Sequence, residues 1–487
     1  MKQVILRNGQ AVVEEVPPPV PGPKEVLVQN AYSVISSGTE MSSLSFSGEP
    51  LWKKILSHRE KVAKGIKMAQ EKGFSHTYKV VKGLFEFGQP TGYSCAGRII
   101  AVGDEVAGFK EGDFVACAGA GYANHAEIVS IPVNLAVKVP EGVSLLEASS
   151  ATIGAIALQG VRQADMRVGE SALVVGLGLL GQLTVQILRS SGVKVFGIDL
   201  SSEKVQLAKQ FDMEWGGAPG GGTLNEIMIR TGGQGVDATI ICAATQSDDP
   251  INQAMEYTRK RGKIVVVGAI GLALKRSPWY EKEIDLRIST SYGPGRYDLQ
   301  YEEEGVDYPY SYVRWTENRN MEAYLELLRD KKISFSSLAG GVYPIEKAQE
   351  AYAALQVVAK PMAVVLEYKR LDGLISSERE KDRKIFLQEG IGKDRVSVAL
   401  VGAGQFATST HLPNLAKLKD IFHLRAVVNR DGAKALQYAK QYGADYAASD
   451  YKEILDDGKV DAVIITTRHN THAKMVLEAL RAGKHVF

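Results

Sequence analysis

A glycine pattern in the middle of the chain constrains the fold more than any other feature. The apolar run Ser171-Ala-Leu-Val-Val-Gly176 is typical of a buried strand, and it leads directly into the G-x-G-x-x-G pattern of residues 176–181. A helix-like stretch follows from Gln182 to Ser190, and Asp199 ends the next apolar run. Such glycines allow a tight turn, close approach of a pyrophosphate and close packing of the helix on the strand. The segment therefore predicts a dinucleotide-binding strand-turn-helix unit.

Asp199 indicates which dinucleotide this unit binds. A carboxylate at the end of the second strand accepts hydrogen bonds from both ribose hydroxyls and repels a 2′-phosphate, so we expect NAD(H) here. A helix cap is the competing interpretation of this residue. The predicted cofactor contacts are Gly176, Gly178, Leu179, Leu180, Gly181, Asp199 and, at the end of a later apolar run, Gly268.

Strand-like runs alternate with helix-like stretches through most of the chain after residue 170. One series covers residues 171–176, 193–199, 236–242 and 262–268, and a second covers 396–402, 424–428 and 460–466. This alternation indicates βαβ units, and hence an α/β chain with two doubly wound parallel sheets. The first 150 residues instead hold short runs between turn residues, which favours a mostly antiparallel β domain.

The second series carries a glycine motif of its own. Gly402-Ala-Gly-Gln-Phe-Ala407 is a G-x-G-x-x-A variant in the same strand-to-helix context. The next run ends in Asn429-Arg430 rather than in an acid, so Arg430 is available for a ribose 2′-phosphate and we expect NAD(P)(H). The alternative is a module that keeps the fold without binding a nucleotide. The expected contacts are Gly402, Gly404, Gln405, Phe406, Ala407, Asn429 and Arg430.

Charge and composition exclude several classes of function. Lys and Arg number 58 against 56 Asp and Glu, so a net charge of +2 gives no field for capturing nucleic acid. No apolar stretch reaches the roughly 18 residues of a membrane helix. The three cysteines form no C-x-x-C pair or disulfide framework, which suits a reducing cytoplasm. Between about Tyr368 and Arg395 the sequence is highly charged and holds no strand-like run, so we predict a linker.

Two known families share these motifs. Residues 1 to about 367 resemble the medium-chain dehydrogenase/reductase superfamily through the stretches 102–115 and 121–127, the first glycine motif and Asp199. Residues from about 393 onward resemble the nucleotide-binding half of the glucose-fructose oxidoreductase/inositol dehydrogenase family through residues 402–407, 466–472 and 482–486. The combination resembles bacterial bi-domain oxidoreductases, which are often encoded among polysaccharide-biosynthesis genes.

The resemblance implies a domain plan. A GroES-like domain covers 1–150, with 342–367 returning to it, and a Rossmann domain covers 151–341. A charged linker at 368–394 precedes a second Rossmann domain at 395–487, in which the resemblance adds Thr466, Asn470 and His472 to the cofactor contacts. In that family a lysine proton donor and a large substrate-binding domain come later in the chain. The second domain is therefore expected to be a truncated form, unable to react in its family's way.

The metal ligands of zinc-type relatives are missing from this sequence. Their Cys-Gly-Thr-Asp and Gly-His-Glu motifs are replaced by Ser37-Gly-Thr-Glu40 and Gly92-Tyr-Ser94, and no cysteine lies near Ala151. Hydroxyl groups are poor zinc ligands, so we predict no metal site. A positioned hydroxyl can protonate the reacting oxygen instead, and the resemblance suggests Tyr93 first and Thr39 second. His125 is a further proton shuttle, although a histidine in a turn is more often solvated or internally bonded.

An aromatic and arginine-rich stretch supplies candidate substrate contacts. It follows a strand that, by resemblance, ends near the nicotinamide. Aromatic faces with guanidinium groups suit a polyhydroxylated or carboxylated sugar. An extended surface loop with an aromatic core is the competing interpretation. The candidate residues are Tyr292, Arg296, Tyr297, Arg314 and Trp315.

These features favour a zinc-independent, NAD(H)-dependent oxidoreductase acting on a secondary alcohol of a sugar, cyclitol or sugar conjugate. Three alternatives stay open: a two-module redox epimerase in a longer natural chain, a quinone or enone reductase, and a non-catalytic nicotinamide-binding scaffold or sensor. We expect a small-molecule substrate, no nucleic-acid or membrane partner and, by analogy with the first family, a homodimer.

Overall fold

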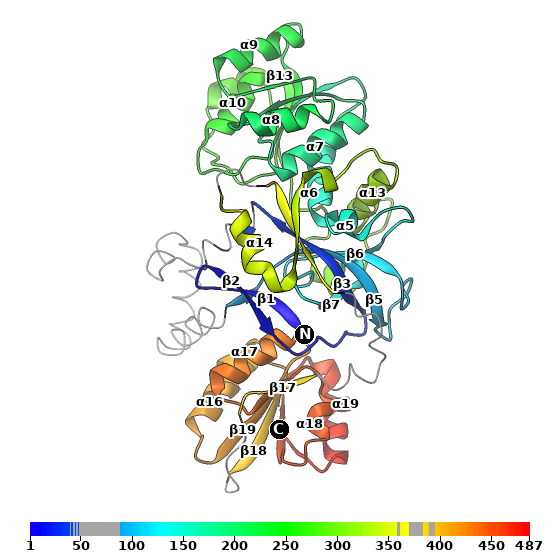
Figure 1. Cartoon of the computed structure of the whole chain (residues 1–487), viewed down its shortest axis with the longest axis vertical. Coiled ribbons are helices and arrows are strands. Elements are labelled where there is room, and N and C mark those ends of the chain that lie inside the picture. The colour runs from blue at the N-terminus through cyan, green and yellow to red at the C-terminus, as the bar shows by residue number, and fades with distance from the viewer. Residues whose placement is uncertain are drawn as a thin grey trace.

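The computed structural model arranges the chain as three bodies in a row. It describes residues 1–38, 40–41, 44, 47, 88–357, 361–369, 383–388 and 395–487. Thr39, one of the two candidate proton donors, lies outside the described residues. The first Rossmann domain, the β domain and the second Rossmann domain follow one another along the longest axis (Figure 1). The α/β fold class with two Rossmann-type sheets is confirmed.

The central body is built on antiparallel strands. Its main sheet has the order β15-β16-β3-β5-β6-β8, with β7 also pairing with β3, and a small sheet has the order β2-β1-β4. Strand β16 pairs antiparallel with β3, so the chain returns to this body after leaving it. The strands are β1 (Lys2–Arg7), β2 (Gln10–Glu15), β3 (Glu25–Ser36), β4 (Gln89–Pro90), β5 (Ser94–Val102), β6 (Phe114–Ala118), β7 (Ile128–Pro132), β8 (Ala136–Lys138), β15 (Ala339–Pro344) and β16 (Ala363–Glu367), and the helices are α5 (Leu145–Ala148) and α14 (Ala348–Ala354).

The first Rossmann sheet is parallel, with the order β11-β10-β9-β12-β13-β14. Alternate residues of its central strand face two different cores, Ala172 and Val174 in one and Leu173 and Val175 in the other, so helices cover both faces. Its strands are β9 (Ser171–Val175), β10 (Lys194–Ile198), β11 (Trp215–Gly217), β12 (Val236–Ile241), β13 (Thr258–Val266) and β14 (Asp285–Ile288). The helices are α6 (Ala151–Ala164), α7 (Leu179–Ser190), α8 (Ser202–Lys209), α9 (Gly221–Arg230), α10 (Asp249–Tyr257), α11 (Arg276–Lys282), α12 (Leu299–Glu302) and α13 (Glu317–Arg329).

The second Rossmann sheet has the order β17-β20-β19-β18-β21-β22. Strand β17 (Lys384–Phe386) pairs antiparallel with β20, although it lies in the stretch predicted to be a linker without strands. That prediction was wrong there, because so short a strand is specified by its neighbour rather than by its own pattern. The other strands are β18 (Val396–Val401), β19 (Phe422–Val428), β20 (Tyr446–Ala448), β21 (Ala462–Ile465) and β22 (His485–Val486), and the helices are α16 (Leu412–Lys417), α17 (Gly432–Tyr442), α18 (Lys452–Leu455) and α19 (His469–Arg481).

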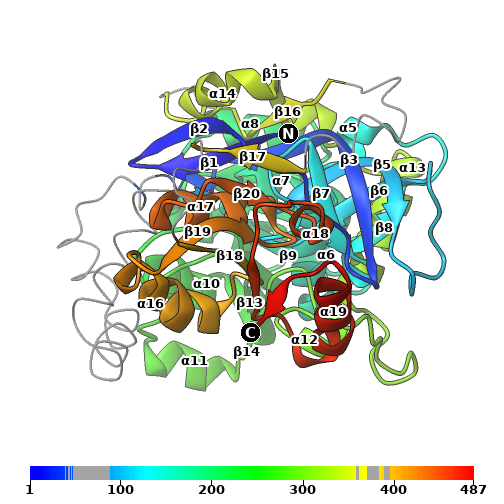
Figure 2. The same cartoon turned by 90° about the horizontal axis from the view of Figure 1, so that it is seen from below.

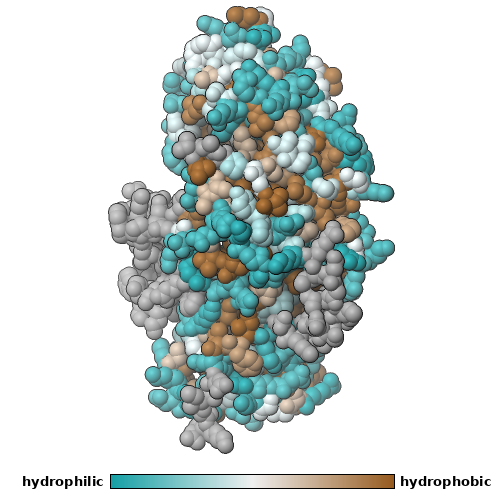
Figure 3. Space-filling model, viewed as in Figure 1, coloured by the Kyte–Doolittle hydropathy of each residue, from teal (hydrophilic) through white to brown (hydrophobic). Residues whose placement is uncertain are grey.

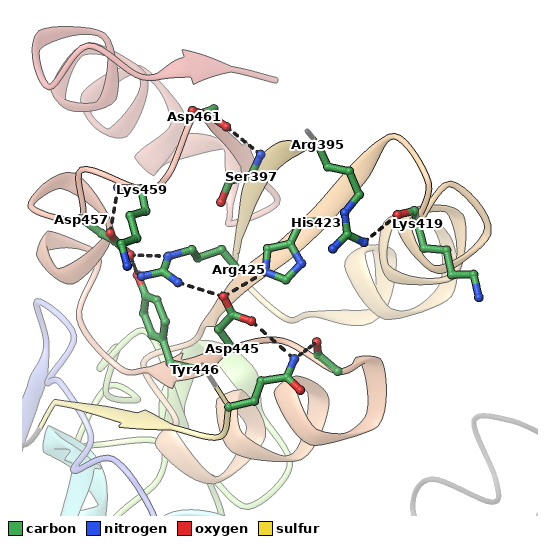
Figure 4. A network of polar contacts seen from close by, with 12 residues as sticks. Arg395, Ser397, Lys419, His423, Arg425, Asp445, Tyr446, Asp457, Lys459 and Asp461 are labelled. Carbon is green, nitrogen blue, oxygen red and sulfur yellow. Dashed lines mark hydrogen bonds and ion pairs between the residues drawn. The ribbon is translucent and has the colours of Figure 1, made fainter. Parts of the chain in front are cut away.

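A buried polar network holds the second sheet together at the end remote from its glycine motif (Figure 4). The Arg425 guanidinium donates to Asp445 at 2.8 Å and to Asp457 at 2.9 Å. His423 lies 2.9 Å from the same Asp445 carboxylate, and the Tyr446 hydroxyl donates to Asp457 at 3.0 Å. Because every charge in the group has an opposite partner, the network fixes β19 and β20 and serves the fold.

The central body and the second Rossmann domain pack directly on one another. Val16 of the β domain shares a hydrophobic core cluster with Leu436 of α17. Close packing leaves no space for a side chain at Gly432, where an added Cβ would lie 1.9 Å from the Pro17 carbonyl oxygen. Figure 2 views the row from the second Rossmann domain, with its last strand toward the viewer.

Hydrophilic residues are spread over all three bodies on the face shown in Figure 3, with apolar residues in smaller groups between them. Among the described residues, no helix combines the length and the apolar character that crossing a membrane requires.

Candidate active site

The first glycine motif forms the turn between β9 and α7. Gly176 has a φ of 89°, and a Cβ there would lie 2.7 Å from the Ala243 backbone nitrogen. A Cβ at Gly181 would lie 2.0 Å from the Gly176 carbonyl oxygen, so this glycine is required by packing of helix on strand. Gly178, in contrast, is the N-cap of α7 and has no atom within 4 Å of an added Cβ. The space above Gly178 is open for a ligand at the helix N-terminus.

Asp199 lies beside this turn, directly after β10. Its carboxylate accepts from the Leu177 backbone nitrogen at 2.8 Å and from the Ser201 nitrogen at 2.9 Å. The N-cap of α8 is Ser201, whose hydroxyl accepts from the Lys204 nitrogen, so Asp199 is not the cap of that helix. Gly268 lies at the same carboxyl edge of the sheet, where a Cβ would be 2.0 Å from the Ala243 carbonyl oxygen. Gly176, Gly178, Asp199 and Gly268 therefore lie at one edge of the sheet, whereas Leu179 is buried in the core.

Tyr93 lies directly before β5 and is half-buried. Its hydroxyl donates to the Ser36 hydroxyl oxygen at 3.0 Å, and its carbonyl accepts from the Thr152 hydroxyl at 3.1 Å. These contacts fix the ring between the end of β3 and the start of α6. The structure thus pairs the first candidate proton donor with a second hydroxyl, a pair that can pass a proton.

A buried network supports the loop that follows Ser36. The Glu40 carboxylate accepts from the Tyr352 hydroxyl at 2.6 Å and lies 2.8 Å from His125 Nε2. The other ring nitrogen of His125 lies 2.7 Å from the Ser33 hydroxyl. Both ring nitrogens are engaged inside the protein and the ring is fully buried, so His125 is a structural residue here rather than a solvent-facing shuttle.

The residues that the resemblance places at the zinc-ligand positions offer few zinc donors. Tyr93 and Ser37 offer hydroxyls and Ala151 offers no ligand, while the Ser94 hydroxyl donates to the Ser149 carbonyl at 2.6 Å. Within the ranges that the structure describes, no three His, Cys, Asp or Glu side chains gather as a ligand set. Catalytic zinc requires three such ligands.

The candidate substrate residues divide into two groups. Tyr292 is buried in the main core, and Arg296 forms a shielded ion pair with Glu302. Trp315 is covered by guanidinium groups, with Arg162 at 3.2 Å and Arg314 at 3.7 Å from its ring centroid. These contacts form the aromatic core that was the competing interpretation of the loop. Tyr297, which is 71% exposed, and Arg314 remain at the surface.

The second glycine motif follows β18 in the same way. Gly402 has a φ of 91°, and the Thr466 hydroxyl donates to its carbonyl at 2.7 Å. The helix entered from Gln405 and Phe406 begins with a π-helical turn over Ala407–His411, and Gly404 leaves open space beside it. His472 Nε2 lies 2.9 Å from the Thr467 carbonyl, which fixes the first turn of α19.

The loop that follows β19 in the second Rossmann sheet faces the β domain. Asn429 accepts from the Asp431 nitrogen at 2.9 Å, and Arg430 Nη1 lies 3.8 Å from the Glu25 carboxylate. Asn470 and Arg430 line a cavity of about 530 Å³ between the two bodies. Arg430, which was predicted to bind a ribose 2′-phosphate, therefore has the acidic side chain of Glu25 as a neighbour.

Comparisons with known families agree with this geometry. Residues 180–306 match the zinc-binding dehydrogenase family, and residues 396–487 match an oxidoreductase family with an NAD-binding Rossmann fold, that of glucose-fructose oxidoreductase and inositol dehydrogenase. The chain is a bi-domain NAD(P)-dependent oxidoreductase.

Named relatives cover the two halves of this bi-domain oxidoreductase separately. D-guloside 3-dehydrogenase of Escherichia coli K12 is 28% identical over 278 residues, covering 55% of this chain and 74% of the relative. A 4-carboxy-2-hydroxymuconate-6-semialdehyde dehydrogenase of Sphingobium is 35% identical over 89 residues, 18% of this chain and 28% of that protein. The solved alcohol dehydrogenase of Thermus sp. ATN1 shares the fold over 76% of this chain and 100% of its own, with a TM-score of 0.58 and 17% identity. The first half is therefore similar to sugar and alcohol dehydrogenases over most of its length.

Sequence reasoning missed a buried acid behind the substrate loop of the bi-domain oxidoreductase. Glu317 is fully buried at the start of α13, and neither of its carboxylate oxygens has a hydrogen-bond partner. Burial, reinforced by Glu302 and opposed by Arg296, raises the pKa of Glu317 to about 9. The side chain therefore carries a proton at neutral pH. No signal in the sequence separates it from the solvated acids common in first turns of helices.

Replacing Glu317 by glutamine is expected to flatten the pH dependence of stability. The pKa of Glu317 is about 9 in the folded protein and near 4.5 in the unfolded protein. The contribution of Glu317 to the free energy of unfolding is therefore complete below pH 4.5, and it is lost as the pH rises toward 9. The full loss in the native protein is on the order of 5 kcal/mol. Thermal unfolding of the first Rossmann domain between pH 5 and 9 measures it. The exposed Glu326→Gln on the same helix is the control, and an unchanged slope in Glu317→Gln would contradict the assignment.

Proposed function

We propose that the β domain and the first Rossmann domain interconvert a secondary alcohol and a ketone on a sugar, cyclitol or sugar conjugate without zinc. The observation that carries the proposal is the hydrogen bond from the Tyr93 hydroxyl to Ser36, since the resemblance implies that Tyr93 takes the place of a zinc-ligating histidine. When bound at the first glycine motif, NAD⁺ would supply the acceptor for the hydride of the alcohol carbon. The hydroxyl proton leaves toward Tyr93, so the substrate loses a hydride and a proton and becomes a ketone.

Tyr93 would act on the reacting oxygen directly. In the reductive direction its hydroxyl donates to the carbonyl oxygen, and the Ser36 hydroxyl, at 3.0 Å, passes the replacement proton. Thr39, which lies outside the described residues, is the second proposed donor. Glu40 accepts from the Ser36 backbone nitrogen and lies beside His125, so these two residues hold the end of β3 in place.

The choice of a sugar-like substrate is supported by the relatives and by the loop after β14. The name of the D-guloside 3-dehydrogenases describes oxidation at position 3 of a glycoside. Tyr297 and Arg314, exposed on the loop, are the side chains proposed to contact sugar hydroxyls or a carboxylate. A role in polysaccharide metabolism and NAD(H) preference through Asp199 belong to the same proposal.

NADH formation with a panel of alcohols tests this function. We expect turnover with glycosides or cyclitols that carry a free secondary hydroxyl, and little with simple primary alcohols. Reduction of quinones by NADPH without any alcohol oxidation would instead favour the quinone reductase interpretation. Absence of turnover with every member of the panel, despite NADH binding, would contradict the proposal.

A further inference from the structure

The cavity between the β domain and the second Rossmann domain joins residues from both. On one side it is lined by Asn429, Arg430 and Asn470, which belong to the predicted nucleotide edge, and on the other by Lys24 and Glu25 at the start of β3. Its volume of about 530 Å³ is in the range of sites for cofactors and other small molecules. The nucleotide edge of the second domain is therefore completed by a different domain.

Glu25 is held in a fixed orientation in this cavity. One carboxylate oxygen accepts from the Gly22 nitrogen at 2.8 Å and from the Ser130 hydroxyl at 2.7 Å. The other oxygen lies 3.8 Å from Arg430 Nη1. The side chain is 21% exposed and lines the cavity. The carboxylate is thus oriented in advance beside the loop that follows β19.

The segment before β3 packs closely against the loop that follows β19. The Val20 nitrogen donates to the Arg430 carbonyl at 3.2 Å. A Cβ at Gly22 would lie 2.1 Å from Arg430 Nη1, and a Cβ at Gly432 would lie 1.9 Å from the Pro17 carbonyl oxygen. Because the Gly432 contact is with rigid backbone, the segment before β3 and the loop after β19 are held against each other, which keeps Glu25 beside Arg430.

We propose that Glu25, from the β domain, supplies the acid that the second glycine motif lacks and makes the second nucleotide site selective for NAD(H). In the first Rossmann domain the acid that follows the second strand is Asp199, whereas the second domain has Asn429-Arg430 there. Glu25 lies in the cavity beside this pair, where a carboxylate accepts ribose hydroxyls and repels a 2′-phosphate. It also pairs with the guanidinium that was expected to attract that phosphate. The inference rests on nucleotide binding by the second domain.

Calorimetric titration of the full chain carrying Gly178→Val, which silences the first site, tests this inference. With Glu25 intact, NADH is expected to bind at least about 10-fold more tightly than NADPH. Glu25→Gln should shift the ratio toward NADPH by about 10- to 100-fold, because it removes the repulsion and frees Arg430. Ser130→Ala, which removes one bond that orients the carboxylate, should shift it in the same direction by less.

Glu141→Gln is the matched control, because Glu141 is an exposed acid of the same β domain that is not among the residues lining the cavity, and it loses the same charge. We expect its NADH-to-NADPH ratio to stay within about 2-fold of the parent chain. A preference for NADPH in the parent, or an unchanged ratio in folded Glu25→Gln, would overturn the inference. Absence of both nucleotides from the second site would overturn it too, while NADH binding by the unmodified chain would leave the proposed function of the first half intact.

Discussion

Gly178→Val is expected to lower the affinity of the first Rossmann domain for NADH by at least about 100-fold, because two or more charge-assisted backbone hydrogen bonds to the pyrophosphate are lost. The protein itself has room for the new side chain, since no atom lies within 4 Å of a Cβ at this position. The valine would instead fill the space that the ligand needs above the N-terminus of α7. Calorimetric titration with NADH measures the loss.

Valine substitutions at two further glycines distinguish the loss of space for the ligand from damage to the fold. Gly221→Val, at the start of α9 and also in open space, should leave NADH affinity and melting temperature unchanged. Gly181→Val should lower the melting temperature, because its Cβ would lie 2.0 Å from the Gly176 carbonyl oxygen. Wild-type NADH affinity at the first site in Gly178→Val would remove the basis for the cofactor assignment.

Tyr93→Phe is expected to lower kcat for alcohol oxidation by about 100- to 1,000-fold, the range associated with loss of a positioned proton-transfer group. The affinity for NADH should not change, because the ring stays packed and only the hydroxyl bonded to Ser36 is removed. Steady-state kinetics combined with NADH titration distinguishes the two effects. The pH profile of kcat should also change shape, which loss of packing alone would not cause.

Tyr280→Phe provides the matched control for this variant. Tyr280 lies on α11 with 69% of its surface exposed, and it loses the same hydroxyl group. Its kcat should equal that of the parent within about 2-fold, as expected for a surface change remote from the site. If Tyr93→Phe behaves like this control, proton transfer must be assigned elsewhere, with Thr39 as the next residue to test.

Local features of this chain could be predicted from its sequence. The turn at Gly176, the start of α7 and the position of Asp199 all depend on residues within about two helical turns or one βαβ unit, so the pattern itself specifies them. The α/β class follows from the same periodicities.

Contacts between remote segments could not be predicted. Strand β17 exists because Ile385 pairs with Ala447 of another element, and its own three residues carry no pattern. Glu25 and Arg430 meet only because two domains pack together. Glu317 looks like an ordinary first-turn acid until tertiary packing buries it. Each of these depends on long-range geometry, which a linear pattern does not encode.

We propose that hydroxyl groups, rather than a metal ion, carry proton transfer in the first half of the chain. The most direct test is NAD⁺ reduction by the full chain after exhaustive treatment with a strong zinc chelator. We predict that turnover stays within about 2-fold of the untreated protein, since the proposed proton transfer through Tyr93 and Ser36 requires no metal ion. Loss of turnover after chelation, with recovery when zinc is added back, would contradict the account.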